Sequence, residues 1–454
     1  MFRLLLFSSI LITLMCCSGN STDSRSTESP KVTAADTVHL QPGTFYPALT
    51  AANSQRRYSL YIPTNYRSGQ KLPLLLFLDP HADGRAPINN YRTLADQYGF
   101  LLLVSLDAKN GMTLPESGAI VGDLIAEANR LLPTAPSSVF LVGFSGGAKA
   151  ALAASISTPG IASVIYCGAA FPPKTLSTEI PSLAMTGLRD MNFSEVLYYT
   201  AALDTLAFRH SLVVSENDHR WPTTREFEPA ILWCMTNRCK SGAICDTTGI
   251  KKLTQSYLAS IQQETDPVMK DFKLRHLVAC TDGILPTESN LQLLMQNKNS
   301  VGFDQRLRQF TDELTYEQQV KKELQESFQS KDLVWWSNRI RRLRSTTGTV
   351  NDRLLGFVSL GAYLYSRNAV DQLKTDQSGH YIDIYRMADP KNPEWAFLSA
   401  CRSMQLGETT VAMTSLNTAV QLGFDDAEKL VQEKTLTGLQ QEPAFQSLVA
   451  KLRQ

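Results

Sequence analysis

The chain has 454 residues, of which 43% are hydrophobic and 19% charged, and its formal net charge is +1 at pH 7. This length exceeds what one compact core usually holds, so we expect two or three domains. A net charge so close to zero gives no electrostatic reason to expect a nucleic acid as partner.

The first 17 residues have the composition of an export signal. A short basic start precedes an apolar run over residues 4–15, which is shorter than the roughly 20 residues that span a bilayer. The run ends in a sequence that resembles a bacterial lipoprotein signal, with Leu14 three positions before Cys17 and a small residue directly before it. We predict a signal peptide over 1–17, lipidation of Cys17, and contact with the membrane through this lipid anchor only. An ordinary secretory peptide is the alternative.

Residues 18–38 are rich in Ser and Thr and contain few apolar side chains. This composition is typical of a flexible segment, so we expect a tether between the anchor and the first folded domain. Lipidation and a tether together predict a location at the cell envelope, either periplasmic or at the cell surface.

Between residues 39 and 248, short apolar runs alternate with amphipathic stretches, which predicts βα units and a mostly parallel sheet. The run at 72–78 is almost continuously apolar, as expected of a strand buried on both faces. A helix over 228–235, with Pro229 in its first turn, closes this domain. Other strands are expected at 57–62, 100–105, 139–142, 161–169, 182–186 and 210–214, and other helices at 91–98, 121–132, 148–155 and 194–208.

After residue 248 apolar residues recur at spacings of three and four, which predicts helices. We expect a helical linker region over 249–350 and an all-α domain over 351–454. The latter resembles a tetratricopeptide repeat, in which small residues let two antiparallel helices approach closely. One or two repeats cannot bury a core alone, so this domain should pack on neighbouring helices or on the first domain, and it offers a surface for a protein partner. The pattern consists of Ala400, Gly407, Ala412, Leu416 and Ala419, with a weaker second unit over 354–385.

The sequence Gly143-Phe144-Ser145-Gly146-Gly147 has the G-x-S-x-G pattern of a nucleophile turn. A predicted strand runs into it and an Ala-rich helix follows, which is the context that this motif requires. The sharp turn leaves no room for side chains two residues before and after the serine. The hydroxyl then projects at the N-terminus of a helix, where partial positive charge favours an oxyanion.

A serine nucleophile needs a histidine base and an acid that orients it, and in this fold the chain order is Ser, acid, His. His219 lies in the loop after the last predicted strand, and Asp190 follows the strand before it. We therefore predict Ser145, Asp190 and His219 as the triad. Asp204 and Asp218 are the weaker alternatives for the acid, because one lies in a predicted helix and the other is too close to His219 in sequence.

The oxyanion hole needs two N–H donors. We expect the N–H of Gly146 as the first, and the N–H of His81 or Ala82, in the loop after strand 72–78, as the second, since Pro80 has no N–H. Asp79, His81 and Asp83 alternate in this loop as zinc ligands can, but without a second cluster this is a weak metal signal.

Cysteine placement gives one further expectation. In an exported protein, the cluster Cys234, Cys239 and Cys245 could hold a disulfide whose pairing the sequence leaves open. A zinc site is the rival, but there is no CxxC pair and no spaced His beside it. Cys167 and Cys401 lie in apolar or helical surroundings and are expected as packed thiols.

The ordered triad and the His-x-Trp-Pro run at 219–222 resemble the feruloyl esterase, polyhydroxybutyrate depolymerase and dienelactone hydrolase branch of the α/β-hydrolases, over residues 40–235. The resemblance implies an α/β fold, with a doubly wound and mostly parallel sheet, before the helical part. It implies a serine hydrolase, without metal or cofactor, that forms an acyl-enzyme from a small or polymer-borne acyl ester. Two alternatives stay open, namely a serine peptidase of the same fold and a non-catalytic envelope scaffold that binds a partner through its helices.

Overall fold

The computed structural model describes residues 40–110, 112–132, 134–171, 180–206, 208–243 and 245–453. Cys17 and the predicted tether lie outside these residues. The chain divides into two compact units, Met1–Thr311 and Asp312–Gln454, and the division falls inside α9 (Phe303–Ser327).

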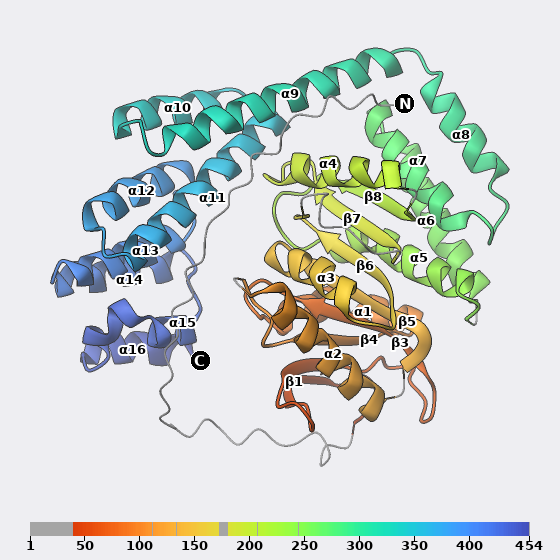
Figure 1. Cartoon of the computed structure of the whole chain (residues 1–454), viewed down its shortest axis with the longest axis horizontal. Coiled ribbons are helices and arrows are strands. Elements are labelled where there is room, and N and C mark those ends of the chain that lie inside the picture. The colour runs from red at the N-terminus through yellow and green to blue at the C-terminus, as the bar shows by residue number, and fades with distance from the viewer. Residues whose placement is uncertain are drawn as a thin grey trace. The chain divides into compact units, whose positions relative to one another are not determined.

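The first unit is built on a sheet that has eight strands within the described residues, in the order β1-β2-β4-β3-β5-β6-β7-β8 (Figure 1). Strand β2 runs antiparallel to β1 and β4, and the pairs from β4 to β8 are parallel. The strands are β1 Phe45–Thr50, β2 Arg57–Tyr61, β3 Leu72–Leu78, β4 Leu101–Ser105, β5 Thr134–Phe144, β6 Ile161–Cys167, β7 Ser182–Gly187 and β8 His210–Ser215.

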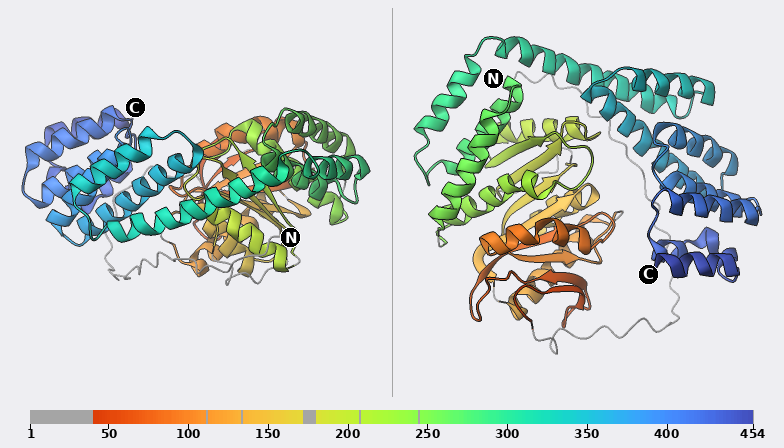
Figure 2. Two further views of the ribbon diagram at one scale, coloured as in Figure 1. Left: turned by 90° about the horizontal axis from the view of Figure 1, so that it is seen from above. Right: turned by 180° about the vertical axis from the view of Figure 1, so that it is seen from behind.

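Helices cover both faces of this sheet (Figures 1 and 2). Leu75 and Phe77 of β3 share a core with side chains of α1 and α5. On the other face, the ring of Tyr166 in β6 lies 5.3 Å from that of Tyr199 in α4. All seven residues of β3 are buried, as expected of a strand covered on both faces. The helices are α1 Arg85–Tyr98, α2 Leu114–Leu131, α3 Gly146–Ser157, α4 Phe193–Leu203, with the 3-10 turn Asp204–Leu206 after it, and α5 Thr224–Lys240.

This doubly wound, mostly parallel sheet with a serine turn between β5 and α3 has the α/β-hydrolase fold, and a helical part follows it, as predicted. Two helices begin earlier than the apolar pattern indicates, because a capping box forms at each N-terminus. Thr113 and Glu116 start α2, and Thr223 and Glu226 start α5. Pro229 consequently lies inside α5 and not in its first turn, which corrects our expectation.

The core of the first unit extends past residue 248, the predicted end of the catalytic domain. Ile250 and Leu253 of α6, and Leu274 and Leu277 of α7, are buried in the same cluster as the inner face of α5. Helix α6 buries its apolar side on α5 and α7, and α7 packs on α5 and β8. These helices are α6 Thr247–Gln262, α7 Pro267–Thr281 and α8 Glu288–Lys298.

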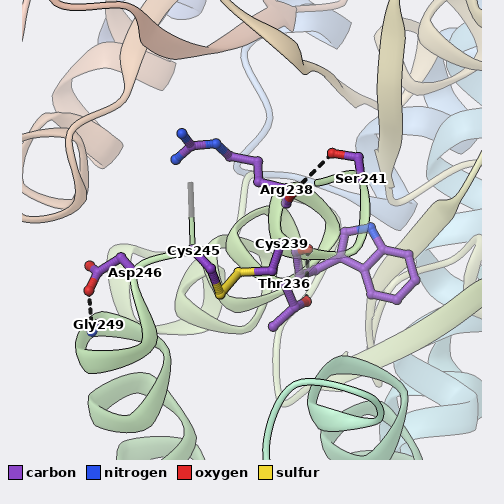
Figure 3. The surroundings of a disulfide bond; sticks show 8 residues. Thr236, Arg238, Cys239, Ser241, Cys245, Asp246 and Gly249 are labelled. Atoms are coloured by element: carbon purple, nitrogen blue, oxygen red, sulfur yellow. Dashed lines mark hydrogen bonds between the residues drawn. A yellow bond between two sulfur atoms is a disulfide. The ribbon is translucent and has the colours of Figure 1, made fainter. Parts of the chain in front are cut away.

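A disulfide joins the C-terminal end of α5 to the residue before the N-cap of α6 (Figure 3). It links Cys239 to Cys245, whereas Cys234 is a buried thiol in the core. The pairing that the sequence left open is therefore Cys239–Cys245. Cys167 and Cys401 are buried free thiols.

The second unit is helical throughout its described residues. Helices α13 and α14 are joined through Gly407, whose φ is +76°, and Ala400, Ala412 and Ala419 are buried at their contact. The paired helices follow the predicted pattern, while their assignment to a tetratricopeptide repeat stays a prediction. Besides the end of α9, the elements are α10 Leu333–Ser345, α11 Thr349–Asp371, α12 Thr375–Ala388, α13 Glu394–Gln405, α14 Thr409–Gln421, α15 Ala427–Gln432, the 3-10 helix Lys434–Leu439 and α16 Pro443–Leu452.

A buried ion cluster lies in the core of the second unit. Glu317 of α9 is fully buried and accepts hydrogen bonds from Arg353 of α11 (2.7 Å from Nε) and from Lys321 (2.7 Å). Burial by itself raises the pKa of Glu317, but the two cations outweigh it and hold the pKa below its ordinary value. The cluster ties α9 to α11. Among the described residues, no helix is both long enough and apolar enough to span a membrane.

Candidate active site

Ser145 occupies a strained turn between β5 and α3. Its φ is 52° and its ψ is −119°, a conformation that residues with a side chain rarely adopt. The N–H of Ser145 donates to the carbonyl of Cys167 in β6 at 2.8 Å, which holds the turn against the sheet. Such a turn presents the serine hydroxyl at the carboxyl end of the strands.

The glycines on either side of Ser145 are required by close backbone contacts. A Cβ at Gly143 would lie 2.2 Å from the carbonyl oxygen of Gly147. A Cβ at Gly147 would lie 1.9 Å from the carbonyl oxygen of Leu78 at the end of β3. Neither position can hold a side chain without moving the backbone, which is why the motif needs glycine at both.

The structure brings the three predicted triad residues together. Nε2 of His219 lies 2.9 Å from Oγ of Ser145, and Nδ1 of His219 lies 2.9 Å from Oδ1 of Asp190. With Nδ1–H donating to the carboxylate, Nε2 is left to accept the proton of the serine hydroxyl. The side chain of Asp190 is 2% exposed and that of His219 is 20% exposed, so the acid is sealed off while the base faces an opening.

Asp190 is held in place by its own turn. The N–H of Asn192 donates to Oδ1 of Asp190 at 2.8 Å, and the Asn192 side chain donates to the carbonyl of Gly168 at 2.8 Å. Gly168 has a φ of +66°, and a Cβ there would lie 2.8 Å from Oδ2 of Asp190 and 3.3 Å from the ring of His219. The backbone at Gly168 therefore passes close to the acid and the base, where a side chain would interfere.

The alternative acids lie elsewhere. Asp204 pairs with His210, at 3.0 Å from Nε2, and Asp218 pairs with Arg220 at 3.2 Å. His276 is buried in the core of the first unit, and His380 belongs to α12 in the second unit. Asp190 is thus the carboxylate that orients His219.

Aromatic side chains pack against the loop that carries His219 and hold it in place. The ring of Phe144 lies 4.8 Å from that of His219 and 5.3 Å from that of Trp221. Nε1–H of Trp221 donates to Oδ2 of Asp79 at 2.8 Å, and the Tyr91 hydroxyl donates to the carbonyl of Pro222 at 2.7 Å. The His-x-Trp-Pro run is therefore fixed to the loop after β3 and to α1.

The loop after β3 folds around Asp79 and does not offer the predicted second oxyanion donor. Oδ1 of Asp79, which is 4% exposed, accepts the N–H of His81 at 2.8 Å and that of Asp83 at 3.2 Å. The N–H of Ala82 donates to the carbonyl of Asp79 at 3.1 Å, with φ of Ala82 at 59°. Both N–H groups that we expected to face the oxyanion, those of His81 and Ala82, are used inside the loop. Since both Asp79 oxygens accept protein donors, this loop is a turn stabilised by the carboxylate.

Gly146 is the first residue of α3, and its N–H makes no hydrogen bond within the described part of the chain. The first amides of a helix lack an intrahelical acceptor and carry partial positive charge. This N–H directly follows the nucleophile, where the predicted first oxyanion donor belongs.

Comparison with known proteins gives structural neighbours only. No protein-family model matches the sequence, and no curated protein matches it. Among solved structures, the chain is similar to a mutant of the feruloyl esterase module from Clostridium thermocellum, with 13% identity, a TM-score of 0.35, and coverage of 45% of this chain and 93% of that one. It is similar to esterase B from Lactobacillus rhamnosis, with 12% identity, a TM-score of 0.36, and coverage of 45% and 90%. It is also similar to an acylaminoacyl peptidase from Pyrococcus horikoshii, with 14% identity, a TM-score of 0.34, and coverage of 42% and 41%.

Proposed function

We propose that this protein is a serine hydrolase that cleaves carboxylic esters through an acyl-enzyme. The observation that carries the proposal is the continuous hydrogen-bond chain from Ser145 through His219 to Asp190, with 2.9 Å at each step, at a strained strand-to-helix turn. Nucleophile, base and orienting acid within hydrogen-bond distance are the arrangement that acyl transfer requires.

In the proposed reaction, Oγ of Ser145 attacks the ester carbonyl carbon while Nε2 of His219 takes the hydroxyl proton. The carbonyl oxygen becomes an oxyanion that accepts the N–H of Gly146. His219 then returns the proton to the departing alkoxide, and the C–O bond to the alcohol breaks. Water, deprotonated by the same imidazole, attacks the acyl carbon of the acyl-enzyme. The imidazolium then gives this proton to Oγ of Ser145 as the acyl–Oγ bond breaks and the acid is released. Asp190 keeps the productive tautomer and stabilises the imidazolium in both steps.

Steady-state hydrolysis of p-nitrophenyl esters of increasing acyl length tests this proposal. We expect turnover by the wild-type protein and a loss of at least about 10³-fold in kcat/KM for Ser145→Ala and for His219→Ala. The matched control is His210→Ala, because this histidine pairs with Asp204 away from the site. Wild-type protein that is folded but hydrolyses none of the esters, or Ser145→Ala that retains full activity, would refute the assignment.

A parallel panel of aminoacyl p-nitroanilides separates an esterase from a peptidase. An amine is a poorer leaving group than an alcohol and depends more on protonation by the imidazole, so this site should cleave esters more readily than amides. We expect ester turnover to exceed amide turnover with the same acyl group. Faster cleavage of the anilides would replace the esterase proposal by a peptidase that uses the same triad.

We also propose that the enzyme works at the cell envelope, anchored through a lipid on Cys17. The support is the lipoprotein-like sequence that ends at Cys17 and the Ser/Thr-rich segment after it. Metabolic labelling with an alkyne fatty acid should mark the wild-type protein in the membrane fraction and fail to mark Cys17→Ala. Labelling of Cys17→Ala to the same extent would contradict this location of the anchor.

A further inference from the structure

The loop after β4 brings a polar side chain to the start of α3. The N–H of Asn110 donates to the carbonyl of Pro80 at 3.0 Å, so this loop is tied to the loop after β3. Oδ1 of Asn110 lies 1.6 Å from the position that a Cβ of Gly146 would take, and Cγ lies 2.8 Å from it. The carboxamide therefore fills the space beside Gly146 where any other residue would place its side chain.

The described backbone around this position supplies one oxyanion donor, the N–H of Gly146, and no second one. Pro80 has no N–H, and the N–H groups of His81, Ala82 and Asp83 all donate to Asp79. The N–H of Gly146 remains as a single donor, whereas an oxyanion in a tetrahedral intermediate is usually stabilised by two.

We infer that the side-chain amide of Asn110 is the second oxyanion donor of this site. Asn side chains can fill this role because a carboxamide carries two N–H donors without a charge. The Asn110 side chain is exposed and makes no hydrogen bond within the described part of the chain, so no protein contact competes for the amide. Nδ2 lies 3.6 Å from the Cβ position of Gly146, and rotation of the amide exchanges Nδ2 with Oδ1 beside this residue. This inference rests on the proposed hydrolase function.

Kinetics of Asn110 variants test the inference, with wild-type activity on the best p-nitrophenyl ester as the reference. We expect Asn110→Ala to lower kcat by about 10²- to 10³-fold with less than about threefold change in KM, because the bond strengthens as charge develops on the oxygen. Asn110→Asp keeps the shape but replaces the donor by an anion, so its kcat should fall at least as far. Lys109→Ala, at the neighbouring exposed position, is the control and should stay within about twofold of wild type.

A second readout separates a direct role from a change in loop structure. A fluorophosphonate places its phosphoryl oxygen in the same hole when it reacts with Ser145, so the rate constant of inactivation should fall in parallel with kcat. Thermal unfolding shows whether each variant is folded. If Asn110→Ala is unfolded, Asn110→Ser takes its place in the test, with a hydroxyl donor on a shorter side chain. Folded Asn110 variants with kcat and inactivation rate within threefold of wild type would overturn this inference and leave the triad standing. A wild-type protein that neither turns over esters nor reacts with the probe would refute the proposed function itself.

Discussion

We expect the first unit to lose stability in mild acid, because the imidazole of His276 is buried in its neutral form. The ring is fully buried between α7, α5 and β8. Nε2–H donates to the carbonyl of Pro229 at 3.2 Å, so Nδ1 accepts the hydroxyl proton of Ser211 at 2.9 Å. Both nitrogens of the neutral ring therefore make a hydrogen bond. A proton added to Nδ1 would face the hydroxyl proton of Ser211, which already occupies this position. Burial is the main reason that the pKa of His276 falls to about 4.

The groups that face this ring do not offset a positive charge. Sγ of Cys280 lies 3.4 Å from Nε2, and the ring of Tyr257 lies 5.5 Å from the imidazole. Burial raises the pKa of Cys280 to about 12 and raises that of Tyr257 as well, so both stay neutral. The ordinary pKa of 6.5 applies after unfolding, so the unfolded chain binds the extra proton first as the pH falls.

The sign and size of the effect follow from these two values. The stability due to neutral His276 is complete above pH 6.5 and is lost as the pH falls towards 4. A difference of about 2.5 in pKa, at 1.36 kcal/mol per unit, corresponds to about 3 kcal/mol in total and to about 2 kcal/mol at pH 5.

The assay is urea unfolding of the wild-type protein and His276→Gln at pH 7.5 and pH 5, followed by tryptophan fluorescence, and the difference between the two proteins isolates the contribution of His276. The Gln side chain is neutral at both pH values, so the variant lacks the contribution of residue 276 to the pH dependence of the free energy of unfolding. This holds even if the substitution changes the stability at pH 7.5. We expect the wild type to lose about 2 kcal/mol more than the variant between the two pH values. An equal loss in both proteins would refute the assignment of a neutral, buried His276.

Three other substitutions test the site and the second unit. Asp190→Asn should lower kcat by about 10³- to 10⁴-fold in ester hydrolysis without lowering Tm by more than a few degrees, because it removes the charge and favours the wrong tautomer; unchanged kcat would contradict the role of the acid. Gly147→Ala should destabilise the first unit by about 1–3 kcal/mol and abolish activity through contact with the end of β3, whereas Gly122→Ala, with open space around its Cβ position, should be neutral or slightly stabilising in the same melts. Arg353→Met should destabilise the second unit by about 3 kcal/mol in chemical unfolding, because Glu317 keeps its charge in the core with one partner fewer; a loss below about 0.5 kcal/mol would show that the pair is not buried.

Much of the first unit could be predicted from the sequence because its signals are local. The apolar run at β3 and the Gly143–Gly147 motif each determine a backbone geometry without reference to distant residues. The order of Ser145, Asp190 and His219 then follows from topology, since successive parallel strands end at the same edge of the sheet. The starts of α2 and α5 were not predicted, because apolar periodicity does not register the Thr-x-x-Glu capping pairs at 113–116 and 223–226 that begin these helices.

The contacts that the sequence could not give are those between loops far apart in the chain. The bond from Trp221 to Asp79 spans 142 residues, and it decides that the loop after β3 closes around a carboxylate. The contact of Asn110 with Gly146 is of the same kind, because nothing in the sequence around Asn110 marks it as a neighbour of the serine turn. The extension of the first core into α6 and α7 also escaped prediction, since helical periodicity does not say which surface a helix packs on.

Peptide mass spectrometry can identify the residue that reacts with a fluorophosphonate, and so tests whether Ser145 is the nucleophile. We expect a single adduct on Ser145 of the folded protein, and no adduct in Ser145→Ala or in His219→Ala. Heat-denatured protein should not be labelled, because reactivity depends on the hydrogen bond from Ser145 to His219. An adduct on a different serine, or no adduct on folded wild-type protein, would show that Ser145 is not an activated nucleophile.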